Sequence, residues 1–275
     1  YILNLCKKFL GLEEPKIRIL LMHDIPSCSH KRFEEKIKFI AKKWNFISPK
    51  EFEDYLSGKK NLEGRNVLLT FDDGFYSNKL IADKILNPLG IKALFFIVGN
   101  FAQLKPDQDP KDFIKENLYP KWRGHDYPEN LEEMKNLSLD DLSHLATKGH
   151  SIGFHTQNHK DLASIDSKSE LKEEIIDGAI ALEEQLGLKI NHFSFGFGNV
   201  DFFSEDALHL AQSHFEYVHT GMRGDNLRNT PKHALRRDTV SLDDTNIEVA
   251  SFLEGSADSR YSKDFNKYES WLKSK

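Results

Sequence analysis

The chain has 275 residues, of which 39% are hydrophobic and 29% charged, enough apolar material for a sizeable core, which excludes a disordered tail. Its 38 basic and 43 acidic residues leave a net charge of −5 without a prominent basic stripe, so we expect no nucleic-acid partner. The apolar runs are too short to form a transmembrane span, and Cys6 and Cys28 are too few for a disulfide framework or a structural zinc finger.

The first segment, residues 1–12, is mildly apolar and carries Lys7 and Lys8 inside it. Signal peptides place their charge before the apolar stretch, so this segment does not resemble one. We expect residues 1–16 to form an N-terminal extension that packs on the domain that follows. The expected location is cytoplasmic, or periplasmic or secreted if an N-terminal signal has been removed.

Seven short, mostly unbroken apolar runs predict strands that are covered on both faces. They are residues 17–22, 67–71, 93–98, 151–154, 191–195, 215–219 and 234–240. Apolar residues at helical spacing predict helices at 33–43 and 170–186, and Ser48 followed by Pro49 predicts another at 49–56. Strands that alternate with helices indicate the α/β class. We predict a single domain over residues 17–275, a distorted (β/α) barrel of about seven parallel strands, closed or incomplete.

Residues 103–136 interrupt this pattern with a long insertion that is rich in aspartate, proline and aromatic residues. A loop of this length in a compact domain is usually functional or disordered. Its aromatic residues favour an ordered excursion near the barrel mouth.

Two adjacent carboxylates, Asp72 and Asp73, directly follow the predicted strand at 67–71. In such barrels the chemistry gathers on the loops after the carboxyl ends of the strands. Two carboxylates there are costly unless a cation shares them, and a metal on one would leave the other ionised as a base. The alternative interpretation is an ordinary Asp-Gly turn.

Two histidines, His155 and His159, follow the predicted strand at 151–154. They are four residues apart, the usual spacing of two imidazoles that bind one cation. A lone histidine is more often a core or surface residue, but a pair at a strand end favours metal binding. With one of the aspartates, the pair predicts a His-His-Asp metal site that keeps an open coordination position.

These motifs resemble those of the polysaccharide deacetylases, carbohydrate esterase family four, which includes chitooligosaccharide, peptidoglycan and poly-N-acetylglucosamine deacetylases. The sequence TFDDG at 70–74 matches the first family motif in full. GHSIGFHT at 149–156, continuing to His159, matches the second. ILLMHD at 19–24 resembles the first strand of the branch typified by poly-N-acetylglucosamine deacetylases. The resemblance extends from about residue 17 to about residue 240.

The resemblance implies a distorted (β/α) barrel and a metal-dependent N-deacetylation of a carbohydrate. Carried over by position, Asp73, His155 and His159 would hold one divalent ion, zinc. Asp72 would be the base that takes a proton from water on the metal, whose pKa a divalent ion lowers towards ~7. The backbone N–H of Phe197 would stabilise the oxyanion.

At the third family motif, this sequence differs from the usual family pattern. The family usually shows an arginine followed by prolines, an aromatic residue and glycine, whereas 193–198 read FSFGFG, with Ser194 in the arginine's place. Arg237, at the end of the last predicted strand, is a substitute, or else a solvated surface residue. The usual C-terminal Leu-x-His, which supplies a general acid, is also absent. His23 is the candidate for that role, and the alternative is a structural histidine.

The predicted function is that of a metal-dependent hydrolase that removes an N-acetyl or other N-acyl group from an amino sugar. Tyr119, Trp122 and Tyr127 are candidates to bind the substrate, since sugar rings pack their C–H faces on aromatic surfaces; they could instead anchor the excursion. The alternatives are a deacylase of a nucleotide-sugar or glycolipid intermediate and a non-catalytic carbohydrate-binding barrel. Asp72 favours catalysis, because a pseudoenzyme is expected to lose its base before its metal ligands.

Overall fold

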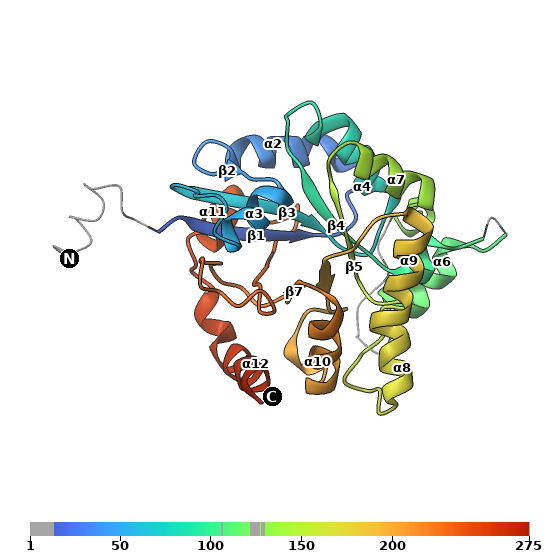
Figure 1. The fold of residues 1–275 in the computed structure, drawn as a ribbon. Helices are drawn as coiled ribbons and strands as arrows, with labels where there is room; N and C mark the ends of the chain where they lie inside the picture. The colour runs from blue at the N-terminus through green and yellow to red at the C-terminus, as the bar shows by residue number, and fades with distance from the viewer. Residues whose placement is uncertain (1–13, 106, 122–126, 128–129, 275) are drawn as a thin grey trace.

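A computed structural model describes residues 14–105, 107–121, 127 and 130–274 (Figure 1). The predicted extension over 1–16 therefore lies outside the described residues up to residue 13, and Trp122 lies outside them too. Within the described ranges, no helix has the length and apolar character that a bilayer crossing requires.

A curled sheet of parallel strands forms the centre of the molecule (Figure 1). The strands are β1 (Lys16–Met22), β2 (Asn45–Phe46), β3 (Arg65–Phe71), β4 (Ala93–Ile97), β5 (Ser151–Phe154), β6 (His192–Ser194), β7 (Tyr217–His219) and β8 (Asp238–Thr239). Their spatial order is β7-β6-β5-β4-β3-β1-β8, with β2 paired to β3 outside this run. An isolated bridge links His219 of β7 to Leu235, three residues before β8. The predicted distorted barrel of about seven parallel strands is confirmed.

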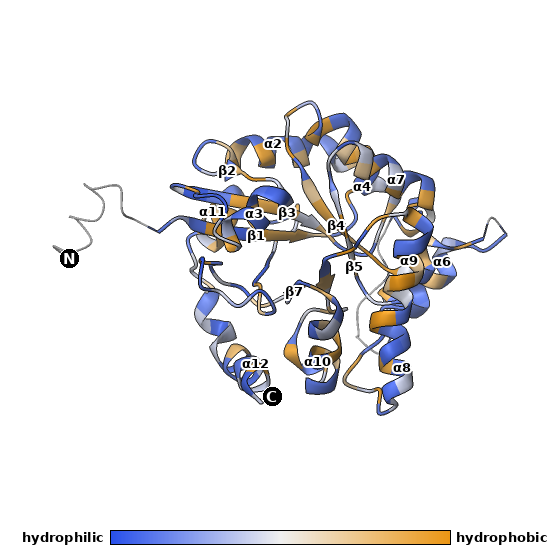
Figure 2. Cartoon of the chain, viewed as in Figure 1, coloured by the Kyte–Doolittle hydropathy of each residue, from blue (hydrophilic) through white to orange (hydrophobic). Residues whose placement is uncertain are grey.

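Helices surround this sheet and turn apolar residues towards it, while hydrophilic residues dominate their outer faces (Figures 1 and 2). The helices are α2 (His30–Ile40), α3 (Pro49–Leu56), α4 (Tyr76–Ile81), α5 (Gly99–Ala102), α6 (Pro110–Phe113), α7 (Leu139–Thr147), α8 (Lys168–Lys172), α9 (Gly178–Leu186), α10 (Glu205–His214), α11 (Asn246–Leu253) and α12 (Ser262–Lys273). Helix α3 has the predicted bounds. It begins at Pro49 because the side chains of Ser48 and Glu51 each accept a hydrogen bond from the other residue's backbone N–H.

The helix predicted at 33–43 is shifted towards the N-terminus, since α2 spans His30–Ile40, and two further predicted elements differ from the structure. The helix expected at 170–186 contains a π-helical turn, Glu173–Asp177, between α8 and α9. The strand expected at 234–240 is reduced to the two residues of β8 and the bridge at Leu235. Apolar periodicity does not reveal either difference, because both follow from how the backbone bonds to its neighbours.

The strand register brings the predicted site residues to one edge. Met22 pairs with Phe71, so His23 and Asp72 leave their strands side by side. Strand β5 ends at Phe154, which pairs with the last residue of β4. Because carboxyl ends of neighbouring parallel strands meet at the same edge, the segment that starts at His155 emerges beside them.

Candidate active site

The carboxyl ends of the strands surround a cavity of about 540 Å³. Every residue predicted to act in catalysis or metal binding lines it, as does Tyr119. The lining residues are Leu21, His23, Asp72, Asp73, Leu118, Tyr119, His155, His159, Phe197, Gly198, Asn199, Phe202, Gly221, Arg237, Thr239 and Tyr261. Residues from eight separate parts of the chain thus meet in one place.

Asp73, His155 and His159 form a buried triad whose potential ligand atoms all lie within 4.8 Å of one another. The Nε2 atoms of both histidines are 3.6 Å from Oδ1 of Asp73. Ligand atoms about 2.1 Å from a tetrahedral ion are separated by roughly 3.4 Å, so the spacing fits one ion.

The surroundings of the triad orient both imidazoles towards Asp73. His155 Nδ1 is 2.8 Å from the carbonyl of Ser194, and His159 Nδ1 is 3.2 Å from the carbonyl of Asn117. A carbonyl can only accept, so each Nδ1 carries the proton and donates it, which leaves Nε2 with a free lone pair. Asn117 belongs to the 103–136 excursion, which therefore helps to build the site.

Burial sets the protonation state of this triad. It lowers the pKa of His155 to about 4 and that of His159 well below its ordinary value. Burial, together with the neighbouring charge of Asp72, raises the pKa of Asp73. Oδ1 of Asp73 is buried and, among the described residues, has no hydrogen-bond partner. Two neutral imidazoles facing an unsatisfied carboxylate oxygen fit a divalent cation.

For a divalent ion at this triad, we expect the pH dependence of binding to come from one carboxyl group. The pKa values of both imidazoles are lowered, to about 4 for His155, so both are neutral at neutral pH, whereas protons still compete with a metal for Asp73 because its pKa is raised. We expect the logarithm of the association constant to rise with pH, with a slope near one, up to the pKa of Asp73 and to level off above it. Competition with a chelator across a pH series measures this slope, and a slope near two would show that an imidazole titrates as well.

Asp72, next to the triad, is held by a two-pronged contact with Arg237. Nη1 and Nη2 of Arg237 donate to the two carboxylate oxygens at 2.6 and 2.9 Å. Arg237 also donates to the Ser194 hydroxyl at 2.5 Å and to the Thr220 carbonyl at 3.1 Å. The guanidinium is fully buried, which excludes the interpretation of Arg237 as a solvated surface residue.

The small side chain at position 194 leaves room for this arrangement. Ser194, which stands where the family's arginine is expected, receives a hydrogen bond from Arg237 instead of supplying a guanidinium itself. Burial alone would raise the pKa of Asp72, but Arg237 and His155 outweigh it and hold the pKa of this carboxyl below its ordinary value. Asp72 is therefore ionised at neutral pH, with one oxygen 3.6 Å from His155 Nε2.

The backbone is unusual at the site. Among the described residues, the non-glycine residues with positive φ are Asp73, Thr156, His159 and Phe197, at 75°, 66°, 57° and 63°. Each is a residue of the site or next to one, and such conformations persist only where the surrounding structure enforces them. Directly after Phe197, Gly198 lies very close to Gly221. A Cβ added to Gly198 would be 2.9 Å from the Cα of Gly221. The close approach of the two glycines thus restricts the turn at Phe197, a residue that lines the cavity.

His23 is exposed at the cavity wall directly after β1. Its backbone carbonyl accepts a hydrogen bond from Asn78 at 2.9 Å, which anchors the turn. The next residue, Asp24, accepts from Ser77 at 2.7 Å and from Asn130 at 2.6 Å, so it stabilises the loops around this corner. The structure places His23 at the barrel mouth, and its role as general acid stays a prediction.

The predicted substrate-binding aromatics have separate positions. Tyr119 and Tyr127 both pack against an apolar cluster that includes Phe101 and Ile114, but only Tyr119 of the two also lines the cavity. This position favours the anchoring interpretation for Tyr127, and Trp122 lies outside the described residues. Sequence reasoning missed Phe202 and Tyr261 as cavity residues. Neither belongs to a motif, and Tyr261 arrives from a segment beyond the resemblance, so no signal in the sequence indicated them.

Comparisons with known proteins agree with this geometry. The family described as polysaccharide deacetylase matches residues 59–215. A protein of Bacillus subtilis (strain 168), YxkH, which is named as a polysaccharide deacetylase, is 25% identical over 254 residues, covering 90% of this chain and 79% of its own. Among solved structures, Streptococcus pyogenes deacetylase PplD in complex with acetate has a TM-score of 0.67 at 18% identity. IcaB from Ammonifex degensii has a TM-score of 0.65 at 24% identity. Both alignments cover 88% of this chain and 99% of the other, and they show a shared fold.

Proposed function

Because this chain belongs to the polysaccharide deacetylase family, we propose that it is a metal-dependent hydrolase that removes the N-acetyl group from an amino sugar of a glycan. Family membership implies the deacetylation of glycans, and the metal and the amino-sugar substrate are inferred from the site. One observation carries the inference: an ionised, arginine-held carboxylate, Asp72, lies beside a buried triad that fits a cation.

The triad of Asp73, His155 and His159 would hold the metal, and zinc suits two imidazoles and one carboxylate. A divalent ion bound there lowers the pKa of a water molecule and polarises the carbonyl of the substrate. The triad supplies three protein ligands, a number typical of sites that leave a position open for chemistry.

The protein's own groups then carry the protons and the charge. Asp72 accepts a proton from the attacking water, and the water oxygen bonds to the carbon of the amide. The N–H of Phe197 donates to the oxygen that becomes negative. His23 gives a proton to the amide nitrogen, the C–N bond breaks, and the products are acetate and a free amine.

The substrate is tested by acetate release from a panel. N-acetylglucosamine oligomers, an N-acetylated nucleotide sugar and an N-acetylated glycolipid precursor are incubated separately with the metal-loaded protein. We expect the oligomers to be deacetylated fastest. Faster release from either precursor would favour a deacylase of a biosynthetic intermediate. Binding of an oligomer without release from any member of the panel would favour a non-catalytic carbohydrate-binding barrel.

The role of His23 is tested by replacing it with glutamine. An amide nitrogen is a poor leaving group until it is protonated, whereas 4-nitrophenolate leaves without help. We expect His23→Gln to lower turnover of the N-acetyl substrate about 10²-fold and to leave hydrolysis of 4-nitrophenyl acetate within about threefold. Equal losses on both substrates would contradict the role as a general acid.

Tyr119 is expected to contact the sugar. Its phenol ring lines the cavity, and a ring of this kind supplies large contact area at a low entropy cost. Tyr119→Ala should raise KM about tenfold, and it should also lower the melting temperature because Tyr119 packs on the same apolar cluster as Tyr127. Tyr127→Ala, the matched control, removes a ring from the apolar cluster of the excursion, so it should lower the melting temperature and leave KM unchanged. A raised KM in Tyr127→Ala together with an unchanged KM in Tyr119→Ala would instead assign the sugar contact to Tyr127.

A further inference from the structure

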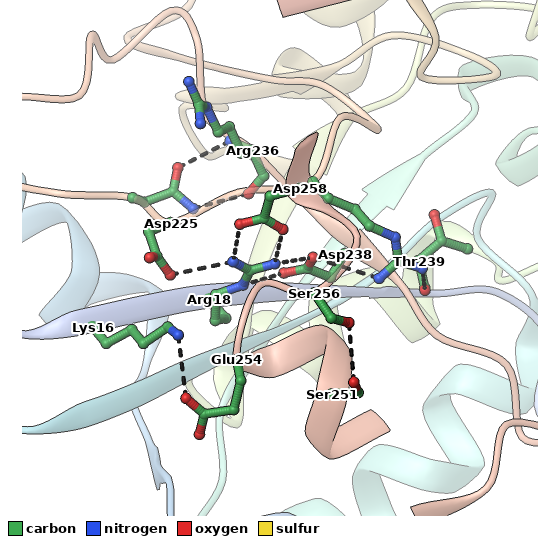
Figure 3. Close-up of polar contacts among 12 residues, drawn as sticks. Lys16, Arg18, Asp225, Arg236, Asp238, Thr239, Ser251, Glu254, Ser256 and Asp258 are labelled. Carbon is green, nitrogen blue, oxygen red and sulfur yellow. Dashed lines mark hydrogen bonds and ion pairs between the residues drawn. The ribbon is translucent and has the colours of Figure 1, made fainter. Parts of the chain in front are cut away.

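A buried arginine on β1, Arg18, binds carboxylates from three separate parts of the chain (Figure 3). Nε donates to Asp238 at 2.7 Å, and Nη2 donates to the other oxygen of the same carboxylate. Nη1 and Nη2 form a second fork with Asp258, at 2.8 and 2.9 Å, and Nη1 contacts Asp225 at 3.3 Å. No step of the proposed reaction uses these groups.

The contact between Arg18 and Asp238 is the inner part of this network. Both side chains are fully buried, whereas those of Asp258 and Asp225 are 29% and 37% exposed. A buried ion pair costs desolvation free energy that its attraction only partly offsets, so it is weak evidence for stability. Its two-pronged geometry, however, restricts where the two backbones can lie relative to each other.

Asp238 directly follows Arg237, the residue that holds Asp72. Arg237, just before β8, lines the cavity and holds Asp72, whereas Asp238, the first residue of β8, contacts Arg18 instead of the cavity. Strand β8 is only two residues long, and it pairs with β1 at Leu20 and Leu21. Backbone hydrogen bonds of 3.0 Å from Arg237 to Met222 and from Val240 to Leu21 flank this short ladder, and the fork from Arg18 adds a side-chain restraint on Asp238.

We propose that Arg18, acting through Asp238, is a positioning residue that fixes β8 so that Arg237 meets both oxygens of Asp72. The proposal rests on the proposed function, because Asp72 is the base of that reaction. A catalytic group must be held within about 0.5 Å of its productive position, and a shift of about 1 Å can cost 10²-fold in rate. The fork on Asp238 supplies this restraint from outside the cavity.

The test replaces Arg18 with lysine, which keeps the charge but loses the fork. We expect Arg18→Lys to lower kcat about 10- to 100-fold with KM within about twofold, since no substrate contact changes. Arg65→Lys is the matched control, because Arg65 lies on the neighbouring strand β3 and contacts a partly exposed carboxylate, Glu254, at 2.8 Å. The control should leave kcat unchanged. An unchanged kcat in Arg18→Lys would overturn the proposal.

A double-mutant cycle separates positioning from general loss of structure. In an Arg237→Met background, Arg18→Lys should cause no further loss of kcat, because the group that it positions is absent. The same fold-loss in both backgrounds would overturn the proposal. Asp238→Asn breaks the same link from the other side, should behave in the same way, and replaces Arg18→Lys if that variant does not fold.

A crystal structure of the variant gives a readout that needs no activity. In Arg18→Lys, the Nη atoms of Arg237 should lie beyond hydrogen-bonding distance of at least one oxygen of Asp72. A fork identical to that of the parent would overturn the proposal, whatever the parent's activity. If the parent releases no acetate but the fork is lost in the variant, the proposed function fails while the positioning by Arg18 stands.

Discussion

Replacing Asp72 by asparagine should abolish nearly all turnover while leaving the metal bound. Asparagine keeps the shape of aspartate and can still accept one hydrogen bond from Arg237, but it cannot take a proton from water. General base catalysis typically contributes ~10²- to 10⁴-fold, so kcat should fall by about that factor. The variant's metal content, measured by elemental analysis, should equal that of the parent, because both oxygens of Asp72 already bind Arg237.

Asp72→Glu is the companion variant. It retains a carboxylate but moves it by about one methylene, so part of the activity should remain if proton transfer is the role of this residue. A parallel loss of metal and activity in Asp72→Asn would show instead that both adjacent aspartates are ligands.

Replacing His159 by alanine should remove the metal and, with it, the activity. Loss of a group that only supports a ligand already costs ~10- to 100-fold in metal affinity, so loss of one of three ligands should cost at least about 100-fold. His159 is buried, and its Nε2 lies 3.6 Å from the unsatisfied oxygen of Asp73. Competition with a chromogenic chelator measures the change in affinity.

The matched control is His144→Ala. His144 is a partly exposed histidine that contacts Asp83 at 2.8 Å on the surface, outside the cavity. Its replacement should leave metal affinity and turnover unchanged. Wild-type affinity in His159→Ala would contradict the assignment of the triad.

The sequence was sufficient to predict six of the strands, β1 and β3 to β7, and the residues at their carboxyl edge, but neither β2 nor the shortness of β8. Unbroken apolar runs located the strands, and side chains that follow such strands must meet at one edge of a parallel sheet. Asp73 and His155 are 82 positions apart in the sequence, yet their side chains are 3.6 Å apart for this reason. Polar residues that directly follow predicted parallel strands can therefore indicate a shared site even when they are far apart in the sequence.

The contacts of Arg237 could be predicted only in part. Its place near the end of the last predicted strand put it at the barrel mouth, and the missing arginine at position 194 made a substitute necessary. The link from Arg18 to Asp238 spans 220 positions and depends on which way each side chain points from a strand of two residues. The position of Tyr261 likewise depends on how the C-terminal segment folds back, which no local pattern specifies.

The most direct test of a metal-dependent deacetylase combines metal titration with acetate release. The purified protein is stripped with a chelator, dialysed and titrated with zinc while acetate release from an N-acetylglucosamine oligomer is followed. We expect the stripped protein to be inactive and activity to rise linearly to a plateau at one ion per chain. Full activity in the stripped protein, or one bound ion with no acetate release from any substrate of the panel, would contradict the proposed function.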